Sequence, residues 1–320
     1  MSGVKVVFMG TPDFAVPALN VLLAEGYDVV AVVSQPDRPK GRKRILTPPP
    51  VKVEAEKHGI PVLQPEKMRS PESVAALAAF EPDLIVTAAY GQILPKSVLA
   101  LPKHGCINVH ASLLPKYRGG APIQHSILKG EAVTGVTIMY MAEGLDTGDM
   151  LAVTEVPITD EDTGGSMFEK LSAAGAELLK RTLPELLSGK LQAVPQNHAE
   201  ATIAPNIKRE DELLRWDKTA IELFNQIRGL NPWPVAFTTL NGEVFKVWSS
   251  LKPSEASQGQ AGKADAVPGT VLQLTDAGME VQTGGGTLWL TVVQPAGKKA
   301  MDVAQFRRGA ALPSGTVLGQ

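Results

Sequence analysis

The sequence contains a single cysteine, Cys106, among 320 residues. One cysteine excludes a disulfide within the chain and indicates a reducing compartment, so we expect a cytoplasmic protein. Long apolar runs are also lacking, since none reaches the roughly 18 residues that a membrane-spanning helix needs. The first residues do not combine a basic segment with an apolar one, as a signal peptide would. We therefore expect no membrane partner.

An excess of one charge is absent as well, because the formal net charge is only −2. A polyanion would therefore need a local basic patch on this protein. The five histidines and the cysteine show no metal-ligand spacing, so we expect no metal site. Gly10-Thr11-Pro12 stands where a dinucleotide-binding protein carries G-x-G-x-x-G, which makes an NAD-dependent dehydrogenase the weakest interpretation. Nothing in the pattern favours an obligate dimer, and we expect a monomer.

The secondary-structure pattern has two parts. Up to residue 187, short β-branched runs alternate with helical patterns, which predicts an α/β domain with a doubly wound, mostly parallel, Rossmann-like sheet. Between residues 236 and 293, short β-prone runs separated by Gly-rich turns predict a small antiparallel β-barrel, similar to an OB-fold. We therefore divide the chain into a domain at 1–189, a linker at 190–209 and a second domain at 210–320.

The most informative stretch runs from Cys106 to Gly120, where a predicted strand ends in a turn. Asn108 and His110 are two residues apart, which places both side chains on one face of an extended chain. Ligands of open α/β sheets bind beyond the carboxyl ends of the strands. An amide donor beside a side chain that titrates near neutrality is a candidate catalytic pair. The alternative is a buried Asn and His that each satisfy a loop carbonyl.

A carboxylate follows the next predicted strand. Asp146 lies in a tight loop between Gly144 and Gly148. In this position it could meet His110 and fix the tautomer of the imidazole. The alternative is a turn in which the carboxylate caps its own backbone. Asp149 is close by and hard to separate on sequence alone, but Asp146 lies deeper in the loop and is our choice.

Residues 36–52 form the densest positive patch of the chain and are rich in proline, so we predict no regular element there. A basic loop beside the site could bind the phosphates of a polyanion and release counterions. The alternative is a solvated loop without a ligand. The candidate phosphate-binding residues are Arg38, Lys40, Arg42, Lys43 and Arg44.

These motifs together resemble the folate-dependent formyltransferases. The resemblance rests on Asn108-Val109-His110, on Ser112-Leu113-Leu114-Pro115 and on Gly144-Leu145-Asp146-Thr147-Gly148. Over its whole length the chain is similar to the branch of this family that formylates aminoacylated tRNA. The matching segments include Gly10-Thr11-Pro12-Asp13-Phe14 and Asn231-Pro232-Trp233-Pro234.

The resemblance implies a function. It implies transfer of the formyl group of 10-formyltetrahydrofolate to the α-amino group of methionyl-tRNA, the initiator, for translation initiation. It further implies that Asn108, His110 and Asp146 are catalytic and that the basic loop, notably Arg42, enters the acceptor end of the tRNA. The C-terminal barrel would hold the tRNA. The residues implied to line the folate pocket are Ser112, Leu113, Leu114 and Pro115.

Three other readings stay open at this point. A related formyltransferase acting on an amino sugar nucleotide or a small amine would share the catalytic residues but would not need the basic loop. A hydrolase that releases formate from the same co-substrate would also leave that loop unexplained. A non-enzymatic RNA-binding protein would explain the loop and the barrel, but not the polar residues at the strand ends.

Overall fold

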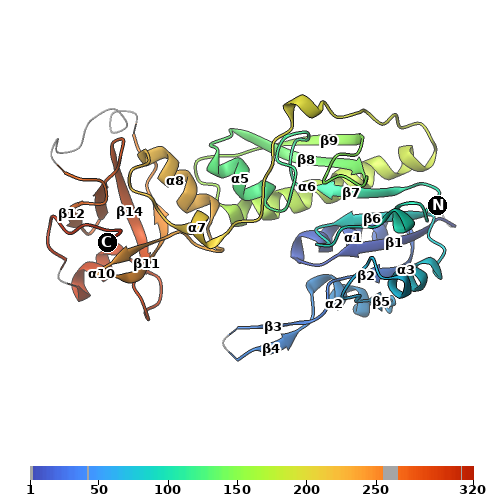
Figure 1. The fold of residues 1–320 in the computed structure, drawn as a ribbon, viewed down its shortest axis with the longest axis horizontal. Helices are drawn as coiled ribbons and strands as arrows, with labels where there is room; N and C mark the ends of the chain where they lie inside the picture. Colours follow the sequence, from blue (N-terminus) through green and yellow to red (C-terminus); the bar gives the residue numbers. More distant parts are fainter. Residues whose placement is uncertain (1–2, 42, 255–265, 311) are drawn as a thin grey trace. The chain divides into compact units, whose positions relative to one another are not determined.

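The computed structural model describes residues 3–41, 43–254, 266–310 and 312–320 (Figure 1). The chain divides into two compact units. The first unit comprises Met1–Pro122, Val133–Pro157 and Phe168–Pro205. The second unit comprises Ile123–Ala132, Ile158–Met167 and Asn206–Gln320. Two short segments that lie between parts of the first unit in the sequence therefore belong to the second unit.

The first unit is built on one sheet, which has the order β5-β2-β1-β6-β7-β8-β9 within the described residues. The pairs from β5 to β7 are parallel, and the pairs β7–β8 and β8–β9 are antiparallel. The predicted doubly wound, mostly parallel sheet is therefore confirmed. The strands are β1 (Lys5–Gly10), β2 (Asp28–Val33), β5 (Val62–Leu63), β6 (Leu84–Ala88), β7 (Cys106–His110), β8 (Val133–Tyr140) and β9 (Met150–Pro157).

Helices cover both faces of this sheet. On one face, Val7 and Met9 of β1 share a core cluster with Leu77 and Val98 of two of the helices. Cys106 of β7 belongs to the same cluster, and burial raises the pKa of its thiol to about 12. The helices of the first unit include α1 (Val16–Ala24, after a 3-10 turn at Asp13–Ala15), α2 (Pro50–Lys57), α3 (Pro71–Ala78), α4 (Lys96–Leu99) and, from Phe168 on, α6 (Gly164–Leu187), whereas α5 (Pro122–Leu128) belongs to the second unit from Ile123 on. Among the helices of the described residues, none is both long and apolar enough to cross a membrane.

The expectation that residues 36–52 contain no regular element is wrong. β3 (Arg38–Lys40) and β4 (Ile45–Thr47) pair as an antiparallel hairpin, and α2 begins at Pro50. Each strand of a two-stranded ribbon has one side without a partner, so Pro39, which has no N–H to donate, can face that side. Figure 1 shows the hairpin projecting from the rest of the first unit.

The second unit contains an antiparallel sheet, with the order β10-β11-β14-β13-β12 and β15 beside β14 within the described residues. The predicted antiparallel β domain at the C-terminus is confirmed. Phe224, Phe245 and Phe306 lie in its core, and the last two form an edge-to-face pair with ring centroids 5.5 Å apart. Its strands are β10 (Phe237–Leu240), β11 (Glu243–Ser250), β12 (Val271–Thr275), β13 (Gly278–Gln282), β14 (Thr287–Gln294) and β15 (Met301–Asp302), and its helices include α7 (Arg209–Glu212), α8 (Ala220–Gly229) and α10 (Val303–Gly309).

Helix α6 packs closely on the strand that carries the candidate catalytic pair. Gly175 faces Val109 of β7, and a β-carbon at this glycine would stand 2.8 Å from the Val109 Cγ1 atom and 3.4 Å from Val136 Cγ1. The absence of a side chain therefore sets the distance between the helix and β7. Val109 lies between Asn108 and His110, so this packing supports both residues from the opposite face of the sheet.

We predict that Gly175→Leu destabilises the protein by about 1–3 kcal/mol, because a side chain there must push α6 away from β7. Ala173 lies on the exposed side of the same helix, so Ala173→Leu is the matched control and should stay within about 0.5 kcal/mol of the parent protein. Urea unfolding curves measure both effects. Equal stabilities for the two variants would contradict the close packing at Gly175.

Candidate active site

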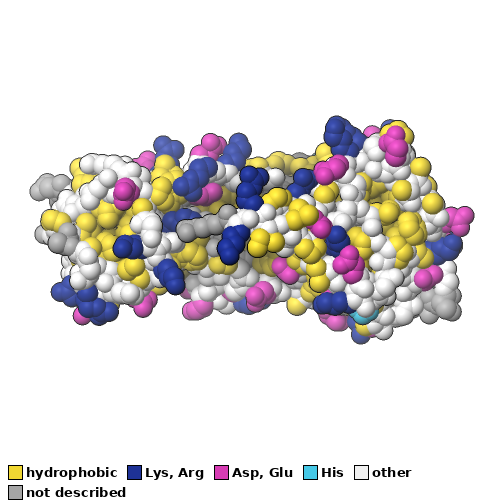
Figure 2. All heavy atoms as spheres, turned by 90° about the horizontal axis from the view of Figure 1, so that it is seen from below, with side chains coloured by type: hydrophobic (Ala, Val, Ile, Leu, Met, Phe, Trp, Pro, Cys, Tyr) yellow, Lys and Arg dark blue, Asp and Glu magenta, His cyan; other side chains and the backbone are white. Residues whose placement is uncertain are grey.

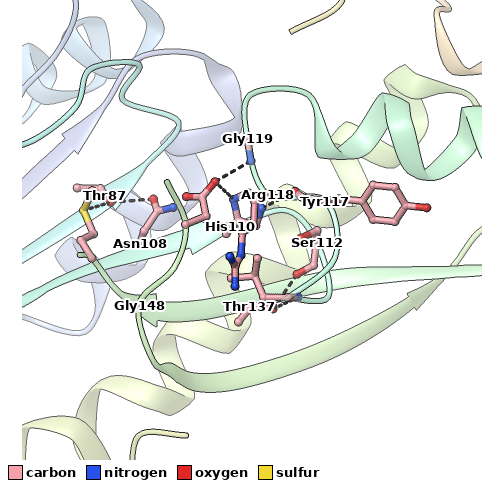
Figure 3. A network of polar contacts seen from close by, with 12 residues as sticks. Thr87, Asn108, His110, Ser112, Tyr117, Arg118, Gly119, Thr137 and Gly148 are labelled. Atoms are coloured by element: carbon pink, nitrogen blue, oxygen red, sulfur yellow. Dashed lines mark hydrogen bonds and ion pairs between the residues drawn. The ribbon is translucent and has the colours of Figure 1, made fainter. Parts of the chain in front are cut away.

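Asn108 sits near the end of β7, next to Thr87 of the neighbouring strand β6. The two residues are register partners, and the Thr87 hydroxyl donates to the Asn108 side-chain oxygen at 2.7 Å. The Asn108 amide nitrogen has no hydrogen-bond partner among the described residues, and it is not a buried atom. The amide is therefore oriented through its oxygen, while its N–H groups remain available to a ligand. Figure 3 shows Thr87 and Asn108 next to each other.

His110 is the last residue of β7 and is almost completely buried. Its Nε2 atom lies 3.0 Å from the backbone oxygen of Tyr117. A carbonyl oxygen can only accept, so Nε2 carries a proton. The other ring nitrogen, Nδ1, lies 3.7 Å from the Asp146 Oδ2 atom. Nε2 is thus held by a carbonyl, while Nδ1 faces a carboxylate oxygen at a distance longer than a hydrogen bond.

Asp146 lies beside His110, as its place between two glycines suggested. Its side chain is 14% exposed, and its Oδ2 atom accepts a 2.8 Å hydrogen bond from the backbone N–H of Gly119. Its backbone has φ 50°, a left-handed conformation that residues other than glycine rarely adopt. Asp149 is exposed and directly precedes β9, and its backbone oxygen accepts from the N–H of Tyr140. The structure therefore brings Asp146, and not Asp149, to the imidazole.

The turn after β7 connects His110 to Asp146. Tyr117 supplies the carbonyl that holds His110, and Gly119 supplies the N–H that holds the Asp146 carboxylate. Gly119 has φ 122°, and a β-carbon there would stand 2.6 Å from the backbone oxygen of Ala204. Only glycine fits this point, because a side chain would be strained and would collide with Ala204. Figure 3 shows His110 below Gly119 within this network.

The residues expected to line a folate pocket follow directly in the chain. The Ser112 side chain is fully buried, and its hydroxyl donates to the backbone oxygen of Lys116 at 2.7 Å. Leu114 is 6% exposed, and its N–H donates to the Thr137 hydroxyl. Leu113 and Pro115 are partly exposed. Ser112 and Leu114 thus fix the conformation of the loop, and Leu113 and Pro115 are the two residues that could contact a ligand.

A pocket of about 690 Å³ opens beyond the carboxyl ends of β1, β2 and β6, and its lining includes neither Asn108, His110 nor Asp146. Its volume is typical of sites for small molecules. Thr11 and Gln35 both donate to the backbone oxygen of Tyr90, which fixes the loop after β6. The lining residues include Thr11, Gln35, Glu66, Lys67, Arg69, Tyr90 and Gln92.

The hairpin β3–β4 carries the described members of the predicted phosphate-binding set. Arg38 pairs with Glu66, a residue of the pocket rim, at 3.1 Å. Lys40, Lys43 and Arg44 are exposed and have no carboxylate partner within the described residues. Arg42 lies outside the described residues. Figure 2 looks onto the side from which the hairpin projects and shows Lys and Arg side chains beside hydrophobic ones.

Not every cation near the hairpin is available to a ligand. Lys52, which the sequence pattern included in the positive patch, forms a 3.0 Å ion pair with Asp37 at the base of the hairpin. Hydrogen bonds from Gln64 and then from Lys52 lower the pKa of the Asp37 carboxyl. The charge of Lys52 is therefore balanced inside the protein.

Two buried residues that the sequence did not single out complete the network. Arg118 and Gln196 are 6% and 5% exposed, and the guanidinium donates to the Gln196 side-chain oxygen at 2.7 and 3.1 Å. Arg118 lies in the stretch from Cys106 to Gly120, so its position in the sequence could have marked it as a candidate. Gln196 lies in the expected linker, where nothing in the local pattern marked it. In the described part of the chain, no group of His, Cys, Asp or Glu residues is arranged to hold a metal ion.

We predict that Gly119→Ala destabilises the protein by about 1–3 kcal/mol, because the new side chain is strained and collides with Ala204. Gly189 also has a positive φ, 70°, but a β-carbon there would meet nothing within 4 Å. Gly189→Ala is therefore the control for backbone strain alone, with a cost of about 1 kcal/mol. Chemical denaturation compares the two. A smaller loss at residue 119 than at residue 189 would argue against the close contact.

Comparison with known proteins places the chain among formyl transferases. Residues 4–183 match the formyl transferase domain, and residues 206–311 match the formyl transferase C-terminal domain. The chain is 58% identical over 316 residues to the methionyl-tRNA formyltransferase of Bacillus subtilis (strain 168), which covers 98% of both chains.

Solved structures share the fold. The methionyl-tRNA formyltransferase from Clostridium thermocellum aligns with a TM-score of 0.55 at 18% identity, over 78% of this chain and 94% of that one. HypX from Aquifex aeolicus, in complex with tetrahydrofolic acid, aligns with a TM-score of 0.62 at 18% identity, over 95% of this chain and 47% of that one. On the identity to its bacterial relatives and the two domain matches, the chain belongs to the methionyl-tRNA formyltransferase family.

Proposed function

We propose that the cluster of Asn108, His110 and Asp146 is the place where this chain performs the reaction of its family. The chain transfers the formyl group of 10-formyltetrahydrofolate to the α-amino group of methionyl-tRNA. The observation that supports this site is the approach of the His110 Nδ1 atom to the Asp146 carboxylate, 3.7 Å away, beside an amide whose N–H groups are available.

The chemistry sets three tasks for the protein. The amine nitrogen bonds to the formyl carbon, the carbonyl electron pair moves to oxygen, and the bond to the folate nitrogen then breaks as that nitrogen takes up the proton lost by the amine. An α-amino group has a pKa near 8, and the neighbouring ester lowers it, so much of the amine is already neutral. A strong base is not needed. The protein must orient the amine, stabilise the negative oxygen and move the proton.

Asn108 is suited to stabilising the negative oxygen. Its amide oxygen is held by Thr87, which leaves its N–H groups without a partner among the described residues. A donor fixed before the reaction does not have to reorganise as charge develops, and loss of such a donor typically costs about 10²–10³ in rate. Thr87 thus supports Asn108 without being a donor to the substrate itself.

His110 and Asp146 are suited to moving the proton. The carbonyl of Tyr117 holds the Nε2 atom of the ring, while Nδ1 lies 3.7 Å from the Asp146 carboxylate, too far for a hydrogen bond, and is the nitrogen left to exchange a proton with the substrate. Asp146 is in turn fixed by the N–H of Gly119. We assign to His110 the transfer of the proton to the leaving nitrogen, and to Asp146 the orientation and charge balance of the imidazolium.

The two substrates approach the cluster from different sides in this proposal. The hairpin carries Lys40, Lys43 and Arg44, and its Arg38 is paired with Glu66 of the pocket. An acceptor strand bound by the hairpin would present its aminoacyl end to the carboxyl edge of the sheet, where the cluster lies. The folate would lie along the loop of residues 112–115. Residues 1–189 would form the catalytic domain, residues 190–209 would form the linker, and residues 210–320 would form the tRNA-binding domain.

We predict that Asp146→Asn lowers kcat about 10²–10⁴-fold, because the amide no longer balances the imidazolium. Asp149→Asn makes the same chemical change in the same loop at an exposed position and should stay within about threefold of the parent enzyme, since exposed substitutions away from the reacting groups change little. Formylation of methionyl-tRNA by both purified variants is the measurement. Equal losses would contradict the choice of Asp146.

We predict that the double substitution Lys43→Gln, Arg44→Gln weakens binding of charged tRNA and makes it less sensitive to salt. Each lost phosphate contact reduces the slope of log K against log salt by about 0.7–0.9. The KM for the folate should not change. Lys5→Gln, at the amino end of β1 and paired with Glu81, is the control. An unchanged salt slope in the double variant would exclude the hairpin from tRNA binding.

We also propose that the protein acts as a monomer in the cytoplasm. The single cysteine supports a cytoplasmic location. The use of methionyl-tRNA, a substrate of translation, supports it as well. Light scattering after size-exclusion chromatography should give 33.9 kDa for the isolated chain. A mass of twice this value would overturn the monomer.

A further inference from the structure

A buried side-chain amide joins the two loops of the active site. Gln196 uses its Nε2 group twice, donating to the backbone oxygens of Asp146 at 2.8 Å and of Gly148 at 2.7 Å. Its Oε1 atom accepts twice from the Arg118 guanidinium. Every donor and acceptor of this amide is therefore occupied within the protein. A fully satisfied buried amide defines one arrangement of the groups around it.

The carbonyls bound by Gln196 belong to the loop that carries the proposed carboxylate. Asp146 has φ 50°, which costs free energy for a residue with a side chain. The hydrogen bond from Gln196 falls on the carbonyl of this same residue. The amide thus offsets the strain at the point where the direction of the carboxylate is set.

Through Arg118, the Gln196 amide is connected to the turn that holds His110. Arg118 lies between Tyr117, whose carbonyl holds the imidazole, and Gly119, whose N–H holds the carboxylate. Its backbone is fixed as well, since its N–H donates to Thr202 and its oxygen accepts from Ala204. The Arg118 side chain therefore links Gln196 to the turn that makes both contacts.

The guanidinium is unusual for a buried charge. Its Nη2 group also donates to the His198 Nδ1 atom at 3.0 Å, and no carboxylate forms an ion pair with it among the described residues. A buried charge without a counter-ion is costly. Loss of a contact with Gln196 or His198 would leave the buried charge less well solvated. The Arg118–Gln196 contact is therefore hard to rearrange.

We propose that Gln196 is a positioning residue for formyl transfer, acting through Arg118 and through the carbonyls of Asp146 and Gly148. It touches no reacting atom. It holds the carboxylate loop and the turn after β7 at a fixed distance, so that the carboxylate meets the imidazole. The proposal rests on the roles assigned above to His110 and Asp146.

Gln196→Glu separates the acceptor function of the side-chain amide from its donor function. The carboxylate keeps the acceptor that Arg118 binds and adds an opposite charge, but it cannot donate to the two loop carbonyls. The variant should still fold, because the new charge pairs with the buried guanidinium of Arg118, and its Tm should lie above that of Gln196→Met. Its kcat should fall about 10²-fold, because a misplacement of about 1 Å has this effect, while both KM values stay within about threefold. Gln196→Met, which lacks both functions, should lose at least as much.

Gln192→Glu is the matched control, since Gln192 is an exposed residue of the same segment. It should behave as the parent enzyme. A double-mutant cycle provides the second readout. If Gln196 acts through Asp146, then Gln196→Glu should have little further effect on kcat in an Asp146→Asn background. A merely structural role would lower the activity equally in both backgrounds.

The outcomes distinguish the two proposals. A fully active Asp146→Asn variant would overturn the proposed site itself. An impaired Asp146→Asn variant beside a fully active Gln196→Glu variant would overturn only the role of Gln196. Independent, additive losses in the cycle, or a change confined to KM, would likewise contradict positioning through Asp146.

Discussion

The hydrogen bond from the Gly119 N–H to the Asp146 carboxylate is the contact on which the rest of the site depends. It joins the turn after β7 to the loop after β8, and it leaves the carboxylate 3.7 Å from the His110 ring. Gly119 makes it possible, because a side chain would collide with Ala204. The sheet brings the two loops to one edge, and this contact fixes the distance between their polar groups.

Backbone groups do most of the orienting here. A carbonyl holds His110, an N–H holds Asp146, and the carbonyls of Asp146 and Gly148 are held by the Gln196 amide. One partner in each contact is a backbone group whose position is set by the path of the chain, and the other is a largely buried side chain, so the contacts are rigid once the loops are packed. The arrangement leaves the N–H groups of Asn108 to interact with a ligand. The conformation of the loops therefore determines how the catalytic side chains are oriented.

The sequence predicted the sheet, the antiparallel C-terminal domain, and the approach of Asp146 to His110, because strand alternation and glycine spacing are local signals. It did not predict the hairpin at residues 38–47, since prolines usually exclude strands and only the free sides of a two-stranded ribbon accommodate Pro39. Gln196 was missed because its partners are 48 to 78 residues away in the chain. For the same reason, no local pattern indicated that residues 123–132 and 158–167 belong to the second unit.

The central claim is that one site takes the formyl group from the folate and delivers it to an amine presented by tRNA. The most direct test offers the purified protein 10-formyltetrahydrofolate together with either methionylated initiator tRNA or free methionine, and follows N-formylation. The account predicts formylation of the charged tRNA, none of the free amino acid, and loss of the reaction with His110→Ala. Turnover of the folate without formylation of the tRNA, or an unimpaired His110→Ala variant, would contradict it.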